Sequence, residues 1–237
     1  MNLLAIETSS PILSVAIKKG RRAVREAVLK GYARHAENLL PLIDRLLRRE
    51  GFGIRDIDAF LIGRGPGSFT GLRVGFATLK GFLACRKKPC YGALAPDLIA
   101  GGFPACKMNK LHVCLDAKRD KLYVRSYRYH DRAWKPQKAV AALSLEAFSS
   151  RLNEDCCIAG DGIATDRCRI LSRPERKLLL AAKKYWHPRA STLIAFFATK
   201  NPMLRALKDP KDFLPVYIRK SEAEERLKAA KFSLRGS

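Results

Sequence analysis

Residues 63–75 read Gly63-Arg64-Gly65-Pro66-Gly67-Ser68-Phe69-Thr70-Gly71-Leu72-Arg73-Val74-Gly75. They follow a short apolar run, residues 58–62, and lead into an apolar stretch of helical character that reaches Ala84. This order predicts a strand-to-helix turn. The glycines permit backbone conformations with positive φ and close approach of another group. A helix N-terminus behind a glycine loop is typical of an anion-binding site.

The segments on both sides of this turn predict one α/β lobe. Three short strands joined by tight turns are expected first, followed by a helix whose leucines and isoleucine recur at helical spacing. A fourth strand then leads into the glycine turn and a second helix. The expected ranges are 3–7, 13–17 and 23–29 for the strands, 34–49 for the helix, 59–62 for the fourth strand and 70–84 for the second helix.

The order of elements repeats in the second half of the chain. Strands are expected at 111–115 and 122–129, a weaker segment at 138–142, a helix at 145–152 and a strand at 156–159. The repeat predicts a duplicated, two-lobed α/β fold with lobes 1–101 and 102–237. A further helix is expected at 190–199, and a charged helical tail at 221–230; whether this tail returns to the first lobe stays open.

Composition limits the environment and the partners. The chain of 237 residues carries 46 Lys plus Arg against 22 acids, a net charge of +24. Such a charge attracts phosphate-rich partners if it gathers on one face, but it fits a solvated basic surface equally well. Seven cysteines without C-x-x-C spacing favour free thiols in a reducing compartment. The N-terminus lacks a basic signal region, and no uncharged run approaches the ~20 residues of a membrane helix, so a cytoplasmic protein is expected.

Two sets of residues are candidates for degenerate phosphate or nucleotide loops. The first combines the end of the first strand with the glycine turn, and the second is a matching glycine turn after the strand at 156–159. Facing glycine turns can form a nucleotide cleft, although each set can also be a plain chain turn. The candidate residues are Glu7, Thr8, Ser9, Gly65, Gly67, Ser68, Thr70, Gly160, Asp161 and Gly162.

The two helices of the first lobe are candidates for a protein-binding face. The first helix has a broad apolar stripe, and the second carries glycines that each cost about 1 kcal/mol relative to alanine inside a helix. Close approach of another helix would offset this cost. That helix belongs either to a partner or to the chain's own core. The predicted interface residues are His35, Leu39, Leu42, Ile43, Leu46, Gly71, Arg73, Val74, Gly75 and Thr78.

Signs of catalysis are few. The four histidines, His35, His112, His130 and His187, are far apart and have no second His or Cys at metal-ligand spacing. No nucleophile elbow, Walker lysine loop or pair of catalytic carboxylates is present. The sequence therefore predicts neither a metal site nor catalytic residues.

With these residues assembled, the chain resembles the bacterial TsaB (YeaZ) family, which takes part in making threonylcarbamoyladenosine in transfer RNA. The glycine segment is the most specific match, and the others are modest one by one. The matching segments are 4–9, 14–16, His35 with 39–44, 63–75, 115–119 and 215–219.

The resemblance implies an actin-like and sugar-kinase-like (ribonuclease-H-like) fold and a non-catalytic scaffold role. A catalytic paralogue, the TsaD transferase, holds a metal through H-x-x-x-H, and here Ala95 and Ile99 fall at the ligand positions. The resemblance also implies pairing with this TsaD-type transferase through the two helices, with a TsaE-type ATPase and tRNA as further partners. No cofactor is expected, although a nucleotide at a subunit interface and a homodimer stay open.

Two alternatives also remain. One is an enzyme of the same fold, a peptidase-like protein or a carbamoyl transferase. The other is a basic tRNA-binding module, for which affinity would fall steeply with salt.

Overall fold

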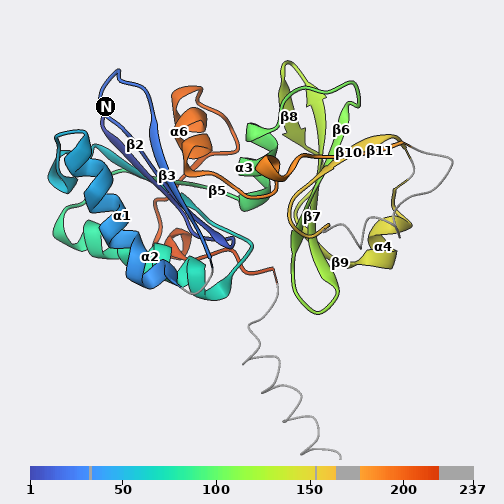
Figure 1. The fold of residues 1–237 in the computed structure, drawn as a ribbon, viewed down its shortest axis with the longest axis horizontal. Helices are drawn as coiled ribbons and strands as arrows, with labels where there is room; N and C mark the ends of the chain where they lie inside the picture. Colours follow the sequence, from blue (N-terminus) through green and yellow to red (C-terminus); the bar gives the residue numbers. More distant parts are fainter. Residues whose placement is uncertain (32–33, 153, 164–176, 219–237) are drawn as a thin grey trace, which may run out of the picture.

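The computed structural model describes residues 1–31, 34–152, 154–163 and 177–218, and Figure 1 shows two sheets side by side. The predicted tail helix at 221–230 and Cys168 lie outside the described residues. In the described part of the chain, the six remaining cysteines are free thiols. None of the helices in these ranges has the length and apolarity needed to cross a bilayer.

The first sheet has six strands in the order β12-β5-β4-β1-β2-β3. The central strand β1 pairs antiparallel with β2 and parallel with β4, and every residue of β1 and β4 is buried. Strands covered on both faces read as continuous apolar runs. The bounds are β1 Leu3–Glu7, β2 Ile12–Lys18, β3 Arg25–Lys30, β4 Ala59–Gly63, β5 Cys90–Ala93 and β12 Arg205–Ala206.

The second sheet repeats this pairing pattern. Its order is β11-β10-β6-β7-β8, with β9 paired to β7, and β6 is antiparallel to β7 and parallel to β10. The duplicated two-lobed α/β fold expected from the sequence is thereby confirmed. The bounds are β6 Lys110–Asp116, β7 Lys121–His130, β8 Ala133–Pro136, β9 Ala141–Ser144, β10 Cys156–Ala159 and β11 Leu178–Leu180.

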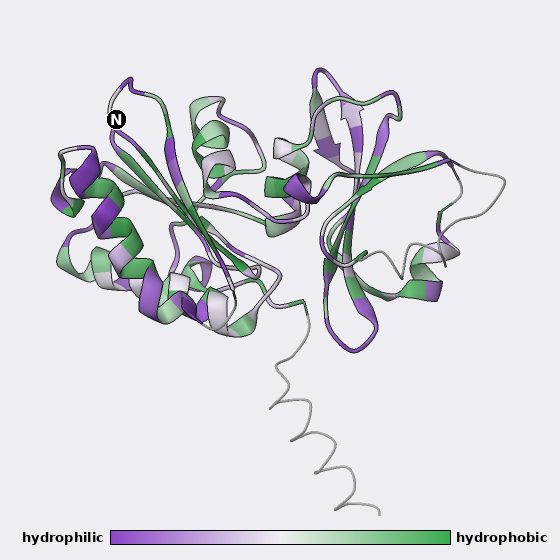
Figure 2. Cartoon of the chain, in the orientation of Figure 1, coloured by the Kyte–Doolittle hydropathy of each residue, from purple (hydrophilic) through white to green (hydrophobic). Residues whose placement is uncertain are grey.

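Helices cover both faces of the first sheet. Helices α1 and α2 contact each other on one face, and α6 packs on β1, β2 and β4 from the other (Figure 1). Figure 2 shows hydrophobic residues along the strands between these layers, and the polar side of α1 turned outward. The α-helices are α1 His35–Arg49, α2 Phe69–Cys85, α3 Ala95–Gly102, α4 Leu145–Ser149 and α6 Ala190–Ala198; the 3-10 turns are η2 Ile54–Asp56, η3 Lys183–Tyr185 and η4 Pro210–Phe213.

Glu26 on β3 fastens α6 to the first sheet. Its carboxylate accepts hydrogen bonds from the Arg189 guanidinium at 2.9 Å, from the Ser191 N–H at 3.1 Å and from the Ser14 hydroxyl at 2.7 Å. Burial alone would raise the pKa of Glu26, but these hydrogen bonds and the Arg189 charge outweigh burial and lower it. Through α6 and β12, part of the chain after residue 102 therefore packs on the first sheet. The division of the chain into lobes at residue 101 stays a prediction.

Helix α3 connects the two sheets. Its buried Asp97 accepts hydrogen bonds from the Arg125 guanidinium at 2.7 Å and from the Tyr127 hydroxyl at 2.6 Å, both on β7. On its other side, Leu98 packs with the apolar residues under the first sheet, where α6 also lies. One short helix thus contributes to both cores.

Several sequence expectations need correction. The weak segment expected at 138–142 overlaps only the start of β9 at Ala141, and β8 lies wholly before it at Ala133–Pro136. The helix expected at 145–152 is shorter in the structure, where α4 has five residues, Leu145–Ser149. Strand β5 and helix α3 were not expected, because residues 90–102 form a short apolar run with Gly92 and Pro96 and no clear periodicity.

Candidate functional site

The glycine segment after β4 lies against the turn that follows β1. A Cβ atom at Gly67 would overlap the Ser9 carbonyl, and one at Gly71 would overlap the Thr8 carbonyl. The Ser68 N–H donates to the Ser9 carbonyl at 2.7 Å, and the Ser68 hydroxyl accepts from the Gly71 N–H at 3.2 Å. The space expected to bind an anion at the glycine loop is thus occupied by the backbone of the turn after β1. Carbonyl oxygens repel phosphate, so this space does not fit a nucleotide phosphate.

The end of β1 carries three buried polar side chains. Glu7 Oε2, Thr8 Oγ1 and Ser9 Oγ have no hydrogen-bond partner among the described residues. The other Glu7 oxygen accepts from the Ser9 N–H at 2.6 Å. Burial raises the pKa of Glu7 to about 7, against the opposing effect of the hydrogen bond from the Ser9 N–H. Glu7 is therefore close to half-protonated near neutral pH.

The rest of this loop has mixed exposure. Gly65 is buried with φ +84°, and its carbonyl accepts from the Ala95 N–H at 2.7 Å. Ser68 is half-buried as the cap of α2, and Thr70 is exposed. The loop therefore joins β4, α2 and α3 into one corner.

The second glycine turn lies at the end of β10. Gly160 adopts φ +102°, and a Cβ there would lie 2.1 Å from the Cys114 carbonyl oxygen of β6. A Cβ at Gly162 would lie 2.8 Å from the carbonyl carbon of Leu115. Asp161 Oδ1 accepts from the Asp116 N–H at 3.1 Å. Burial raises the pKa of Asp161 to about 6. The structure therefore places both predicted loop sets at strand ends, each closed by its own lobe.

The apolar stripe of α1 is not a free surface. Leu39, Leu42, Ile43 and Leu46 belong to the core between α1, α2 and the first sheet, with exposed fractions of 1%, 3%, 3% and 8%. In this structure the chain itself covers these four side chains, and their assignment to a partner face stays a prediction. The physical reason is that β2, β3 and α2 pack against this stripe.

The other predicted interface residues divide by exposure. His35 is buried, with Nε2 3.1 Å from the Ser10 carbonyl, and Gly71 and Gly75 face Thr8. Val74 and Thr78 are half-buried. Arg73 is exposed and lies over the Phe69 ring at 3.9 Å. Of the ten predicted interface residues, only Arg73, Val74 and Thr78 on α2 are not buried.

The outward faces of α1 and α2 carry residues that are not among the predicted interface residues. Leu40 is 51% exposed on α1. Ala77 and Gly81 are exposed on α2, and a Cβ added to Gly81 would meet no atom of the described part of the chain within 4 Å. A leucine on the otherwise polar face of an amphipathic helix was the available signal. We call Leu40, Ala77 and Gly81 the outer helix face.

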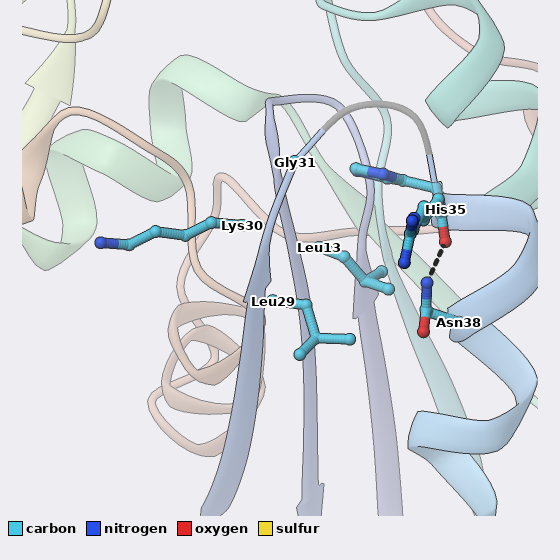
Figure 3. A pocket seen from close by; sticks show the side chains of 7 residues that line it. Leu13, Leu29, Lys30, Gly31, His35 and Asn38 are labelled. Atoms are coloured by element: carbon cyan, nitrogen blue, oxygen red, sulfur yellow. Dashed lines mark hydrogen bonds between the residues drawn. The ribbon is translucent and has the colours of Figure 1, made fainter.

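A hollow of about 390 Å³ opens between the ends of β2 and β3 and the start of α1. Figure 3 shows Lys30 pointing away from His35 and Asn38, and the Asn38 amide donates to the Arg34 carbonyl at 2.8 Å. The basic and polar groups do not converge on one centre, so the lining gives no geometry for a specific ligand.

Comparison with known proteins places the chain in a family. The family model of TsaD, tRNA N6-adenosine threonylcarbamoyltransferase, matches residues 31–227. The chain belongs to the TsaD family. It is 28% identical over 158 residues to the tRNA threonylcarbamoyladenosine biosynthesis protein TsaB of Escherichia coli (strain K12), covering 65% of this chain and 67% of that protein.

Two further similarities concern TsaB and YeaZ. TsaB of Buchnera aphidicola subsp. Schizaphis graminum (strain Sg) is 24% identical over 210 residues, which are 86% of this chain and 97% of that protein. The structure of YeaZ from Pseudomonas aeruginosa has a TM-score of 0.74 at 26% identity, covering 91% of this chain and 99% of that one. The resemblance to TsaB (YeaZ) expected from the sequence is confirmed.

Within this TsaD-family chain, α3 is the element of greatest interest for chemistry. Ala95 and Ile99, at the positions where the resemblance puts the transferase's metal ligands, are buried with exposed fractions of 0% and 3%. Both pack in the apolar core of the second sheet. In the described ranges, no three His, Cys, Asp or Glu side chains come together as a metal site. These residues do not fit a metal at α3.

Proposed function

We propose that this TsaD-family protein is a non-catalytic subunit required for N6-threonylcarbamoyladenosine formation in tRNA, and that it acts in the cytoplasm by binding and activating a TsaD-type transferase. Family membership and the TsaB similarities support the pathway. The accessory role is supported by α3, where buried alanine and isoleucine replace metal ligands. A TsaE-type ATPase and tRNA are the further members of the assembly in this proposal.

The observation that carries the binding surface is Gly81. Glycine inside a helix costs about 1 kcal/mol relative to alanine. Residues 1–31, 34–152, 154–163 and 177–218 offer no packing reason for this glycine, because none of their atoms lies within 4 Å of a Cβ built there. A partner helix that approaches the outer helix face closely would use this space and bury Leu40. The proposed docking site is thus the outer helix face rather than the buried stripe.

Co-purification with the TsaD-type transferase of the same organism tests the surface. Leu40→Asp and Gly81→Leu are expected to abolish capture, because one puts a charge into the interface and the other fills the approach space. The matched control is Leu179→Asp on β11, since Leu179 is 48% exposed and lies on the second sheet. Circular dichroism checks that each variant is folded. Full capture by both α1 and α2 variants would refute the docking site.

The accessory role is tested separately. We expect the isolated protein, supplied with threonylcarbamoyl-adenylate and tRNA, to modify no adenosine, and the reconstituted assembly to do so. Modification by the isolated chain would support the enzyme alternative. If tRNA binds the isolated chain with affinity that falls steeply as salt rises, the net charge of +24 contributes to tRNA binding. Sedimentation of the same sample shows whether a homodimer uses the same face.

A further inference from the structure

Two cysteines from separate parts of the chain meet beneath the second sheet. Cys106 lies in the loop that connects α3 to β6, and Cys157 lies on β10. Their sulfur atoms are 2.8 Å apart. This separation is inside the contact distance of two unbonded sulfurs and within about 0.8 Å of a disulfide bond length. The fold has therefore already placed the two sulfurs for bond formation.

The hydrogen bonds indicate where the two thiol protons lie. The Cys106 thiol donates to the Met108 carbonyl at 2.9 Å. Its sulfur is then free to accept, and the Cys157 thiol donates to it. The Cys157 sulfur thus faces the Cys106 sulfur directly.

Access to reagents differs between the two thiols. Cys106 is partly exposed, and its neighbours Ala105 and Lys107 are exposed, whereas Cys157 is fully buried. The adjacent Cys156 is equally buried but packs in a different apolar cluster, with Leu145 and Phe148. Neighbouring residues of a strand point to opposite faces, so Cys156 cannot replace Cys157 in this contact.

We propose that Cys106 and Cys157 form a reversible thiol–disulfide pair that is oxidised by low-molecular-weight disulfides and fastens the α3–β6 loop to β10. The Cys106 thiolate attacks one sulfur of the reagent disulfide, breaks its S–S bond and releases one thiolate, which takes up the proton that Cys106 lost. The Cys157 thiolate then attacks the Cys106 sulfur and releases the second reagent thiolate, which takes up the Cys157 proton. The protein loses two hydrogens, and the reagent becomes two thiols.

The order of the two attacks follows from exposure. Burial, and then the hydrogen bond to Cys106, raise the pKa of Cys157 to about 12. The thiolate is the nucleophile in this exchange, so the partly exposed Cys106 reacts first and the buried Cys157 resolves the mixed disulfide. The short sulfur–sulfur distance makes this second step intramolecular.

The experiment treats the folded full-length protein with oxidised glutathione, blocks remaining thiols by alkylation and maps peptides without reduction. We expect a peptide pair linked through Cys106 and Cys157, which separates on reduction with dithiothreitol. In Cys157→Ser, the mixed disulfide between Cys106 and glutathione should persist, since no resolving thiol is present. Cys156→Ser is the matched control on the same strand and should form the linked pair as the wild type does.

Two results would overturn the proposal. One is a wild-type protein that keeps glutathione on Cys106 to the same extent as Cys157→Ser. The other is a Cys157 that stays open to alkylation after oxidation while Cys106 is consumed. Should Cys157→Ser fail to fold by circular dichroism, the presence or absence of the linked peptide in the wild type decides alone.

Discussion

At the scale of single residues, Glu7 links the fold to pH. Its folded-state pKa is raised from 4.5 to about 7, chiefly by burial. An acid with a raised folded pKa stabilises the fold fully below its unfolded pKa, and this stabilisation is lost as pH rises through the folded pKa. Between about pH 5 and about pH 8 the protein should lose about 2.5 kcal/mol of unfolding free energy through Glu7 alone.

Urea unfolding of the wild type and Glu7→Gln at these two pH values measures this contribution. Glutamine does not titrate, so the variant should gain about 2.5 kcal/mol relative to the wild type on going to the higher pH. Glu37→Gln, at an exposed position of α1, is the control for removing a carboxylate outside this buried site. A pH-independent difference for Glu7→Gln would mean that Glu7 is ionised in the folded protein throughout.

At the scale of elements, α2 contains two glycines in opposite environments. A methyl group at Gly71 would overlap the Thr8 carbonyl, whereas one at Gly81 would enter open space. We expect Gly71→Ala to lower the free energy of unfolding by about 3 kcal/mol, because backbone cannot give way as a flexible side chain can. Gly81→Ala should raise it by about 1 kcal/mol through helix propensity. Urea unfolding of both variants checks the contrast, and equal effects would contradict the close β1-turn packing.

The same helices show what the sequence could and could not predict. Periodicity located α1 and α2 to within one residue at each end, since apolar spacing and glycine punctuation both mark them. The pattern cannot tell whether a buried stripe faces the chain's own sheet or a partner, and for Leu39 and Leu46 the answer is the sheet. A glycine likewise indicates that another group approaches closely, but it does not indicate which group. At Gly71 the approaching group is the turn after β1.

The sequence predicts where the candidate loops lie in the fold, but it does not predict how deeply their acidic side chains are buried. Glu7 ends one predicted strand and Asp161 follows another, so their positions at sheet ends followed from alternating elements. Their burial and raised pKa values depend on contacts between segments about 50 residues apart, such as Glu7 with Gly63 and Asp161 with Asp116, which no local pattern encodes. The Cys106–Cys157 contact has the same long-range origin.

At the scale of the whole molecule, the two sheets depend on each other through α3. Asp97 is 4% and Arg125 15% exposed at the side chain, so their charges are largely removed from water. Breaking such a pair from one side leaves an uncompensated buried charge and costs about 3–5 kcal/mol. Since α3 also packs beneath the first sheet, the damage to its anchor on β7 should weaken the coupling between the lobes.

Two optical signals can measure this coupling because both tryptophans belong to the second half of the chain. Trp134 lies in the core of the second sheet, and the Trp186 indole donates to the Ala181 carbonyl at 2.9 Å beside β11. Fluorescence therefore reports on that half alone, while far-ultraviolet circular dichroism reports on both. For the wild type we expect one urea transition common to the two signals.

In Asp97→Ala we expect the fluorescence transition to move to lower urea and to separate from the circular dichroism transition. The double variant Asp97→Ala/Arg125→Leu should recover part of the loss, because no unpaired guanidinium remains buried, whereas Tyr127 still lacks its acceptor. A double variant as unstable as Asp97→Ala would show that the buried charge is not the cause. Coincident transitions in Asp97→Ala would show that the lobes stay coupled without this ion pair, and that α6 and β12 hold them together instead.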